Sequence, residues 1–496
     1  MAKMQYRLFG GGVLHWVWFA QENDYIYNHY KNRKESDGMA VLVRDKDFYR
    51  TLLRLAVPIA LQNFLTFGVT FIANLMVGTL GENIIAGVYM GNQLQTFLQF
   101  YVTGIDGAVL VLAAQYWGRR DAISIRKLVA MAGCISLAGG LLLTVSAYVM
   151  PEQLMRIFTS EPAIIAESVR YIRVVAVSYI FFSLSQIFIS SMRSVENVKI
   201  GMYTSLAALA VSVALNYVFI FGKLGVPAMG VVGVAMSTAI SRAVELIVIT
   251  VYMLFVDKRL HMRLRDFIKS WDLSLLKDFA RYGLPVLGGN VVWAVNVLTQ
   301  SGIIGRMGTE AVASVSIVGM LNNLVFVWVN GLGAGVGIIT GQTVGAGKYN
   351  TMKLYAKTIQ LMFAALGVVY CIVMFLTKDW FLSLYNINDA TRVIAQQFMV
   401  VMAVAGAGRC YQAVCLSGLV KAGGDTSFVF RNDTIFVFAV VLPSALIAMN
   451  VFHMPPWVVY ACLQSDQILK CFVAVVKINR FRWMKNLTHQ ELAEET

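Results

Sequence analysis

The chain consists of long apolar stretches separated by short polar connections; two of the clearest are Leu128–Met150 and Leu354–Leu376. About twenty apolar residues in a row are enough for a helix to cross a bilayer. The pattern therefore predicts an all-α polytopic membrane protein with twelve transmembrane helices. The predicted spans are 52–77, 84–115, 126–149, 168–192, 200–221, 229–255, 276–304, 310–340, 352–377, 391–418, 428–450 and 456–478.

The first six spans and the last six repeat one sequence pattern. Matching residues recur 227 positions apart: Pro58 and Pro285, Gln115 and Gln342, Gly118 and Gly345. Farther along the chain the offset is 228: Arg193 and Lys421, Arg242 and Lys470. Six spans per repeat bring both halves into the membrane from the same side. We therefore expect two six-helix lobes around a central cleft, related by a pseudo-two-fold axis along the membrane normal. Both prolines fall in the first turns of their predicted spans.

Basic residues gather in alternate connections. Lys and Arg are frequent before 54, near 116–127, in 257–281 and after 477, whereas Gly78–Asn83 and Asn450–Pro456 contain none. The positive-inside rule places the basic connections and both termini in the cytoplasm. We expect a multi-pass protein of the plasma membrane, which in bacteria is the inner membrane. The net charge of +14 follows this topology, so it does not indicate nucleic-acid binding.

Composition agrees with a membrane protein, because only 14% of the residues are charged, against about 25% in soluble domains. The patterns above divide the chain into five parts. These are a cytoplasmic N-terminal extension (1–50), an N-lobe with helices one to six (51–256), a cytoplasmic linker (257–275), a C-lobe with helices seven to twelve (276–480) and a cytoplasmic C-terminal tail (481–496). We expect this chain to act as a monomer in the lipid bilayer.

Cysteine and histidine form no metal-binding pattern. The six cysteines contain no CxxC pair, and the five histidines lie in the tails or connections. Paired His or Cys ligands are what a metal site in the membrane requires. No clustered catalytic set is found at either interface. The sequence therefore predicts no enzyme, no metal site and no bound cofactor.

Four segments resemble the multidrug and toxic compound extrusion (MATE) family of bacterial transporters. They are LRLAVPIALQNFLTFGVTFIANLMVGTLG (53–81), AAQYWGRRD (113–121), MRSVENVKIGMYTSLAALAVSVALNYVFIFG (192–222) and GLVKAGGDTSF (418–428). The resemblance covers about residues 50–488. It implies a secondary active transporter that exports small amphipathic, often cationic, organic compounds by alternating access of two lobes. The coupling ion in antiport would be H⁺ or Na⁺. A lipid-precursor flippase of related fold, a channel and a membrane-embedded protein without transport activity remain alternatives.

Ionisable groups inside a membrane are costly, so each is a candidate functional residue. Three carboxylates are candidates for ion coupling: Asp106, Glu245 and Asp466. Glu245 follows Arg242 by three positions, and Lys470 follows Asp466 by four. Both spacings place the partners on one helix face, so we expect structural ion pairs there. Arg409 has no local partner of opposite charge.

Amide and aromatic side chains are dense on the first two helices of each lobe. An amide facing lipid lacks hydrogen-bond partners, so many of these side chains should face the cleft. An aromatic ring there can stack on a planar substrate or attract a cation. The candidate residues of the substrate cavity are Gln62, Asn63, Asn74, Asn290, Trp293, Asn296, Asn323 and Arg409.

The family's usual coupling carboxylates are missing. Where many members have an acidic residue on the first helix, this chain has Ala73, and the positions of two further family carboxylates hold Trp293 and Cys410. Asp106 is the leading replacement, because its repeat counterpart is Gly333 and symmetry does not require a carboxylate there. The coupling ion stays open at this point.

Overall fold

The computed structural model describes residues 42–43, 45–77, 82–159, 161–223, 225–263, 266, 272–385 and 387–488, without the side chains of 70, 71, 74, 75, 82 and 83. Most of the predicted extension 1–50 and a smaller part of the linker 257–275 therefore lie outside the described residues. The described residues from Asp45 onward belong to one compact unit.

Every regular element in the described chain is helical. The N-lobe contains α2 (Lys46–Val77), α3 (Glu82–Gly118), α4 (Ala122–Val149), α5 (Pro151–Arg156), α6 (Pro162–Val175), α7 (Val177–Ser194), α8 (Lys199–Phe221) and α9 (Gly230–Val251), which continues into the π-helical η2 (Tyr252–Val256). The C-lobe contains α11 (Leu273–Gly305), α12 (Thr309–Gly345), α13 (Tyr349–Ser383), α14 (Asp389–Ala413) with η3 (Val414–Lys421), α15 (Thr426–Ile435) with η4 (Phe436–Val441), α16 (Leu442–Asn450), α17 (Pro456–Leu463) and α18 (Asp466–Asn479).

The predicted helical membrane fold is confirmed. Among the described residues, ten helical spans are long and apolar enough to cross a membrane, and an eleventh results if α6 and α7, bent by 53°, form one crossing. The remaining long helix is α11, with 33 residues, which does not meet the same criterion of apolar composition. Twelve crossings therefore stay a prediction that depends on α11.

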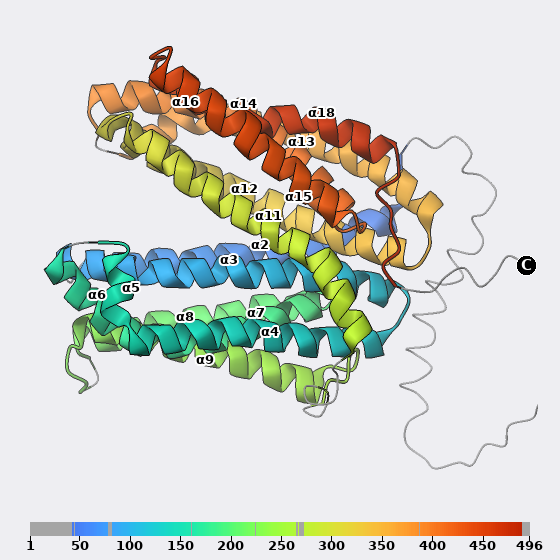
Figure 1. Ribbon diagram of the computed structural model, residues 1–496, viewed down its shortest axis with the longest axis horizontal. Coiled ribbons are helices and arrows are strands. Elements are labelled where there is room, and N and C mark those ends of the chain that lie inside the picture. The colour runs from blue at the N-terminus through green and yellow to red at the C-terminus, as the bar shows by residue number, and fades with distance from the viewer. Residues whose placement is uncertain are drawn as a thin grey trace, which may run out of the picture. The chain divides into compact units, whose positions relative to one another are not determined.

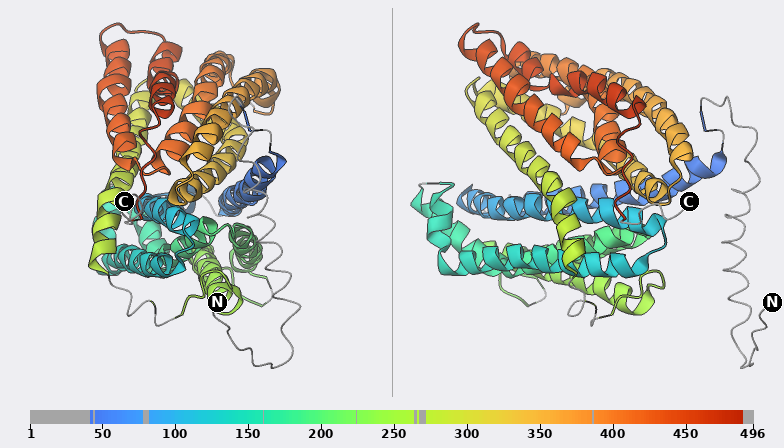
Figure 2. Two further views of the ribbon diagram at one scale, coloured as in Figure 1. Left: turned by 90° about the vertical axis from the view of Figure 1, so that its right-hand side faces the viewer. Right: turned by 45° about the vertical axis from the view of Figure 1, so that its right-hand side comes forward.

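The first helix of each lobe packs against the second helix of the other lobe. α2 contacts α12, α11 contacts α3, and α3 and α12 contact each other. Because α11 and α12 repeat the sequence pattern of α2 and α3, this packing has two-fold pseudo-symmetry. Figures 1 and 2 show the two lobes, α2–α9 and α11–α18, joined along these four helices.

Small residues allow the close approach between the lobes. A Cβ added at Gly331 of α12 would lie 2.5 Å from the Ala60 Cβ of α2, and one added at Gly104 of α3 would lie 2.3 Å from Leu287 of α11. Gly331 and Gly104 are 227 positions apart, as are Leu287 and Ala60. The repeat register is therefore also the register of the contacts. Membrane helices associate through such packing because lipid supplies no hydrophobic force between them.

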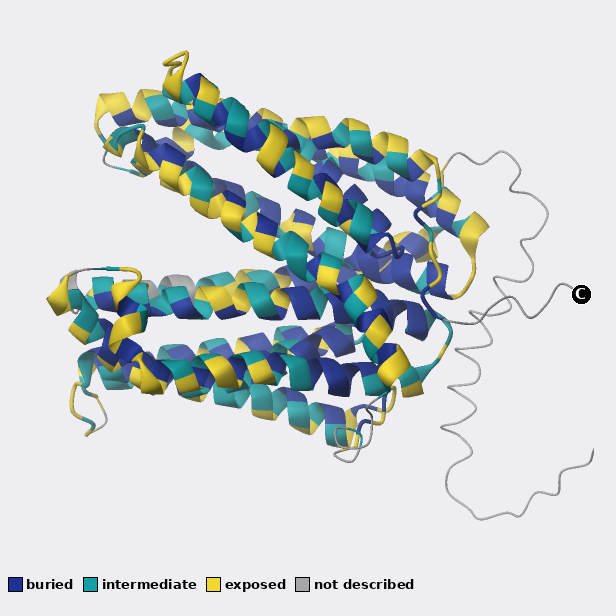
Figure 3. Cartoon of the chain, viewed as in Figure 1, coloured by how far each residue is buried: buried dark blue, intermediate teal, exposed yellow. Residues whose placement is uncertain are grey.

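These contacts lie at one end of the lobes, which we call the basic end: the start of α2 and α11, the end of α3 and α12, and the adjoining basic connections. Buried residues gather there, and the lobes diverge toward the opposite end (Figure 3). One hydrophobic core, which includes Ile105, Leu112 and Leu128, fills the N-lobe near the basic end. The positions that pack the lobes together are therefore concentrated in half of each long helix.

Pro58 and Pro285 do not lie in first turns as expected. Each lies inside its helix, twelve residues after the first residues Lys46 and Leu273. The helices begin before the apolar runs because polar first turns project beyond the apolar layer. At α11 the Asp272 side chain fixes that early start by accepting a hydrogen bond from the Ser274 amide at 3.1 Å.

Replacing Gly331 by valine should weaken the contact between the lobes. The new side chain overlaps Ala60, and overpacking of this kind costs about 1–3 kcal/mol. We expect a clearly lower Tm of the purified protein in detergent. Gly319→Val is the matched control on the same helix, since nothing lies within 4 Å of a Cβ there. An equal Tm for both variants would contradict the packing argument.

Candidate functional site

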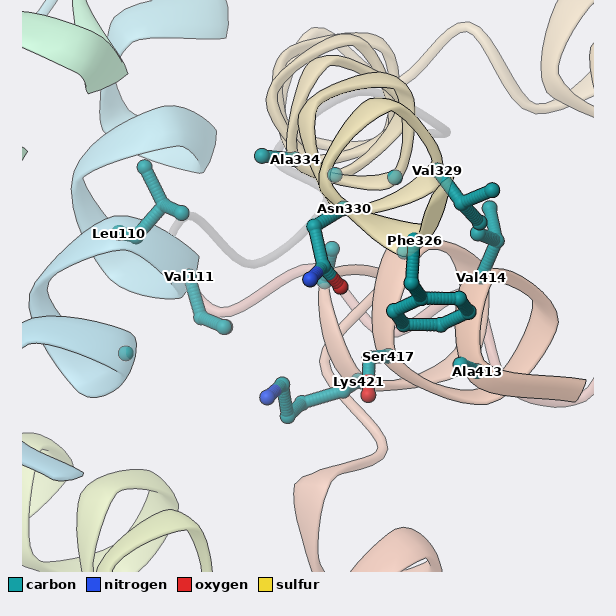
Figure 4. Close-up of a pocket in the computed structure, with 15 residues that line it drawn as sticks. Leu110, Val111, Phe326, Val329, Asn330, Ala334, Ala413, Val414, Ser417 and Lys421 are labelled. Atoms are coloured by element: carbon teal, nitrogen blue, oxygen red, sulfur yellow. The ribbon is translucent and has the colours of Figure 1, made fainter. Parts of the chain in front are cut away.

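A cavity of about 230 Å³ lies where the two lobes meet. The N-lobe contributes Leu110 and Val111 of α3, and the C-lobe contributes residues of α12 and η3. Most of the lining is apolar, and the polar side chains are those of Asn330, Ser417 and Lys421. Figure 4 shows Lys421 reaching from η3 into the space on the side of Val111. The cavity therefore combines apolar walls with one ammonium group.

The π-helical segment η3 forms one wall of this cavity. α14 changes at Val414 into a wider turn that ends at Lys421, and four residues of η3 line the cavity, Val414, Ser417, Gly418 and Lys421. A π-helical turn shifts the face on which later side chains lie, and such turns occur frequently at functional sites. Here the shift puts Ser417 and Lys421 on the cavity side together with Gly418.

Two equivalent glutamines close the basic end. Gln115 of the N-lobe donates its side-chain amide to the Ala422 carbonyl at 3.3 Å. Gln342 of the C-lobe donates to the Ser194 carbonyl at 3.1 Å. The two donors are 227 positions apart and the two acceptors 228, so each lobe bonds the other in the same way. Beside them, a Cβ added at Gly345 would lie 2.1 Å from the Gln115 carbonyl oxygen.

The residues after α18, Arg480–Thr488, form a strap that joins the two lobes. Trp483 is fully buried in the C-lobe, where a Cβ at Gly423 would meet its ring at 2.3 Å. Leu487 belongs to the hydrophobic core of the N-lobe, and its amide donates to Gln115 Oε1 at 2.9 Å. Arg119 donates to the Thr488 carbonyl at 2.8 Å. The predicted C-terminal tail is thus packed over its first residues.

Asp425 anchors the strap. Its carboxylate lies 2.7 Å from Lys477 Nζ and 2.8 Å from Lys485 Nζ. Burial raises the pKa of Asp425, but hydrogen bonds from both lysines outweigh it and hold that pKa below its ordinary value. A carboxyl with a depressed folded pKa contributes stability above the unfolded value of about 3.9 and loses it as the pH falls through the folded value. The anchor therefore stays intact around neutral pH.

Asp106 lies on α3 next to the cavity. Its Oδ1 atom is buried without a hydrogen-bond partner among the described residues. The carboxylate interacts electrostatically with Arg193 and Lys421, which are repeat equivalents. Arg193 in turn donates to Gln62 Oε1 at 2.7 Å. Gln62 is 4% exposed, so it supports Arg193 from inside the N-lobe and does not line the described cavity.

Glu245 forms an ion pair with a single cation, Arg242. Its Oε2 lies 2.7 Å from Arg242, and its Oε1 accepts a hydrogen bond from Gln186 at 3.1 Å. The guanidinium of Arg242 also lies 5.0 Å from the centroid of the Phe182 ring. The site is a compensated ion pair inside the N-lobe, with both carboxylate oxygens occupied.

The C-lobe residue equivalent to Arg242 is Lys470, which contacts two carboxylates instead of one. Lys470 Nζ lies 3.0 Å from Asp466 Oδ2 and 2.9 Å from Asp433 Oδ1. The other Asp466 oxygen accepts from Gln467 at 2.8 Å, and Gln467 accepts from Gln412 at 2.9 Å. One ammonium therefore faces two carboxylates inside the C-lobe.

Arg409 does have a partner, an aromatic one. Its guanidinium lies 4.2 Å from the centroid of the Phe326 ring, and Phe326 lines the cavity. Trp293 is 49% exposed and meets Phe100 across the lobes at a centroid distance of 5.9 Å. The predicted aromatic residue thus lies at the lobe junction but is not part of the described cavity.

The predicted cavity amides are dispersed. Asn290 donates to the Val286 carbonyl of its own helix at 3.0 Å, and buried Asn296 accepts from Gln300 at 3.1 Å. Asn63 is half-buried and Asn323 is exposed. The side chain of Asn74 lies outside the described residues. None of the five described amides among the candidates lines the described cavity, whereas the neighbouring Asn330 does.

Three charged residues at these sites are absent from the candidates that we drew from the sequence. Asp433 lies five residues inside the predicted span 428–450, so its intramembrane position was visible. Arg193 and Lys421 lie just past the ends of predicted spans and look like ordinary basic flanks. Their signal is the repeat, which aligns these two cations at equivalent positions of the two lobes.

A family model described as MatE matches residues 58–218 and 285–447, one segment in each lobe. The chain is 23% identical over 447 residues to "Multidrug resistance protein MdtK" of Yersinia enterocolitica, covering 88% of this chain and 95% of that protein. It is 25% identical over 403 residues to "Probable multidrug resistance protein NorM" of Streptococcus pneumoniae, covering 79% and 86%.

Solved structures share the fold. A MOP superfamily transporter from Pyrococcus furiosus superposes with a TM-score of 0.77 at 18% identity, covering 87% of this chain and 96% of that chain. The Vibrio cholerae MATE transporter VcmN in the bent form gives a TM-score of 0.78 at 14% identity, covering 87% and 96%. At these identities the likeness concerns the fold alone.

Removing both glutamine side chains, in Gln115→Ala/Gln342→Ala, should loosen the basic end. Each loss leaves buried backbone groups unpaired, which costs about 1–3 kcal/mol, so the closed arrangement should lose population at least tenfold. Spin labels at the exposed, equivalent positions Ile123 and Asn350 should then report a longer and broader distance distribution. The control is Gln396→Ala, whose bond to exposed Asp379 lies elsewhere. An unchanged distribution in the double variant would contradict the closure described here.

Proposed function

This chain belongs to the MatE family, and from that premise we propose that it is a secondary active efflux transporter for small amphipathic organic compounds, driven by inward flow of H⁺ or Na⁺. The observation that carries the proposal is the cavity between two pseudo-symmetric lobes that are closed together at one end. The relatives named as multidrug resistance proteins support the substrate class. The absence of a clustered catalytic set in the sequence supports a transporter over an enzyme.

The distribution of basic residues supports an orientation in the inner membrane. Arg119, Arg126 and Lys127 lie at the basic end, as do Lys348 and Lys485. By the positive-inside rule this end faces the cytoplasm, together with both termini. The conformation is then closed toward the cytoplasm, and opening of the Gln115 and Gln342 contacts is the step that gives access from inside. Since one chain supplies both lobes and the cavity, a monomer suffices for this cycle.

We place the coupling site in the C-lobe. Two carboxylates, Asp433 and Asp466, share one salt-bridged ammonium, Lys470. Lys421 and Arg409 act on them only through longer-range electrostatics. A bound H⁺ or Na⁺ would neutralise one of these two carboxylates, and the cost of burying the pair beside a single ion-paired ammonium would fall accordingly. Glu245, by contrast, already has its own cation in Arg242 and serves as a structural pair.

Asp106 has a different environment. It interacts with two cations, Arg193 and Lys421. Adding a proton to a carboxylate that interacts with two cations removes counter-charge from both, which is unfavourable in a membrane. We therefore assign Asp106 to holding the cations at the lobe junction, and rank it behind Asp466 as the ion-binding group.

Expression of the chain in bacteria that lack their major efflux pumps should lower the accumulation of amphipathic fluorescent dyes. We expect at least a threefold decrease that disappears when an uncoupler or a sodium ionophore collapses the driving gradient. Dye fluorescence in whole cells measures this. A panel with cationic, neutral and anionic dyes covers the substrate class.

The control is the same bacterial strain without the expressed chain. Efflux that persists without any ion gradient would contradict secondary transport. No effect on any dye in the panel would contradict export of amphiphiles.

Neutralising the C-lobe carboxylates should uncouple transport. In proteoliposomes with an imposed H⁺ or Na⁺ gradient, we expect Asp466→Asn and Asp433→Asn each to lower gradient-driven dye transport at least tenfold, because one of the two carboxylates that the ion would neutralise is gone. Glu245→Gln should lower it less than twofold at equal amounts of folded protein. The same assay identifies the ion.

Asp106→Asn decides between the two candidate sites. If coupling survives in this variant, Asp106 is excluded as the ion carrier. If coupling is instead lost in Asp106→Asn and retained in both C-lobe variants, the assignment of the ion to Asp433 and Asp466 is wrong.

A further inference from the structure

We propose that the cavity at the lobe junction binds the anionic group of an amphiphilic substrate through Lys421, so that this transporter prefers organic anions over cations. The inference rests on the proposed transport function and gives the charge of its substrate. It differs from the expectation of often cationic substrates that the family resemblance implies.

The lining of the cavity carries a positive charge only. Among the described residues that line it, Lys421 is the one charged side chain, beside the polar groups of Asn330 and Ser417. The remaining walls, including Leu110, Val111 and Val329, are apolar. No carboxylate of the described chain lines the cavity, so a cationic ligand would meet an ammonium there without a counter-charge.

The ammonium of Lys421 has no hydrogen bond or ion pair in the described part of the chain. It extends into the cavity toward the α3 side in Figure 4. Its electrostatic interactions are with Asp433 and Asp106, which lie in different lobes. A partly buried ammonium without a bonded partner is unfavourable in a membrane protein. An anionic group in the cavity would supply the missing hydrogen bonds and charge.

The nearby carboxylates are engaged with other cations. Asp433 and Asp466 are both within 3.0 Å of Lys470 Nζ. Asp106 is shared between Lys421 and Arg193, and Arg193 interacts with it as well as with Gln62. Lys421, which has neither a hydrogen bond nor an ion pair among the described residues, is therefore the cation that remains open to a ligand.

The aromatic wall also disfavours a cationic substrate. Arg409 lies over the Phe326 ring with 4.2 Å between its guanidinium carbon and the ring centroid. A cation bound by the ring would compete with that guanidinium for the negative face. An anion at Lys421 would instead place its apolar part toward Phe326 and Val414, with Arg409 adding a favourable long-range charge.

The ligand chemistry follows from these walls. A volume of about 230 Å³ is below the usual range of about 300–1,000 Å³ for drug-sized molecules. The cavity accommodates one anionic group and a ring or a short chain. The same chemistry occurs in free aromatic sulfonates or carboxylates and in isoprenyl-linked phosphates, so the experiment includes one of each.

The test uses two dyes with the same rings and different charge. These are 8-anilino-1-naphthalenesulfonate, which is anionic, and N-phenyl-1-naphthylamine, which is neutral. Binding to the full chain in phosphatidylcholine nanodiscs is measured by dye fluorescence, with empty discs subtracted. We expect the anionic dye to bind at least tenfold more tightly to the wild type than to Lys421→Gln. The Kd of the neutral dye should change less than twofold.

Two further variants separate charge from shape. Lys421→Arg keeps the charge and should recover most of the affinity for the anionic dye. Asp106→Asn removes the competing carboxylate and should increase that affinity, the opposite sign from Lys421→Gln. Lys378→Gln, on α13 and over the Phe375 ring, is the control for loss of a lysine elsewhere. Thermal unfolding of each variant verifies that it is folded.

The proposal is overturned if Lys421→Gln leaves the Kd of the anionic dye unchanged, or if a cationic dye such as ethidium binds the wild type more tightly than the anionic one. Competition then distinguishes the two ligand sources. If farnesyl pyrophosphate displaces the anionic dye at a lower concentration than a free naphthalenesulfonate does, the ligand is a lipid-linked phosphate. The reverse order indicates a free organic anion. Displacement by neither contradicts an anion site.

The proposal of an anion site and the proposal of efflux can fail independently of each other. Export of cationic dyes from cells, together with Lys421-independent binding of the anionic dye, keeps the transporter and removes its preference for anions. Lys421-dependent binding without export of any dye keeps the anion site and removes the efflux function.

Discussion

The close approach of backbone to backbone at the basic end is the constraint on which the rest of the structure depends. Lipid gives two membrane helices no hydrophobic reason to associate, so the lobes are held by packing and hydrogen bonds. Gly118 and Gly345 leave room for the opposite carbonyl oxygens, and Ala114 faces Gly341 where α3 and α12 cross. That proximity lets Gln115 and Gln342 reach carbonyls of the other lobe. Without the glycines, the glutamines would have no partners in range.

This constraint also fixes where the cavity forms. The contacts of α3 with α12 are tight at the basic end, at Gly118 and Gly345. The cavity lies beside this contact, and Lys421 in its wall directly precedes Ala422, the acceptor of the Gln115 bond. The strap extends the same closure, since Leu487 enters the N-lobe core while Trp483 stays in the C-lobe. Any movement that separates the lobes at this end must therefore break the glutamine bonds, withdraw Leu487 and change the surroundings of Lys421 together. Closure and cavity are parts of one mechanical unit.

The sequence was sufficient to predict the symmetric contacts between the lobes, but it was not sufficient to predict all partners of the charged side chains. The offset of 227 positions that pairs Gln115 with Gln342 also pairs Gly104 with Gly331, so the symmetric contacts could be anticipated from the repeat alone. The pairs Arg242 with Glu245 and Asp466 with Lys470 follow from spacing along one helix. The ion pair of Asp433 with Lys470 cannot be predicted in this way, because the two residues lie on different helices and the spacing rule applies only within one helix. Gln62 was expected to face the cleft; it supports Arg193, because an amide is satisfied equally well by a buried guanidinium.

The two lobes share their helix packing and the positions of two cations, but not the positions of their carboxylates. This asymmetry suits a transporter. The cations repeat, Arg193 with Lys421 and Arg242 with Lys470, whereas the carboxylates do not: Asp106 has Gly333 as its counterpart, and Asp466 has Thr238. A symmetric set would bind the same ion in both lobes. Here Glu245 has a salt-bridged cation of its own in Arg242, whereas Asp433 and Asp466 share Lys470. Neutralising one of these two carboxylates changes the charge of the C-lobe alone, next to α14 and α18, which carry Arg409 and Lys470. The C-lobe also supplies Lys421. An ion bound in this lobe therefore acts on the same body that holds the substrate's charge, which is the coupling an antiporter requires.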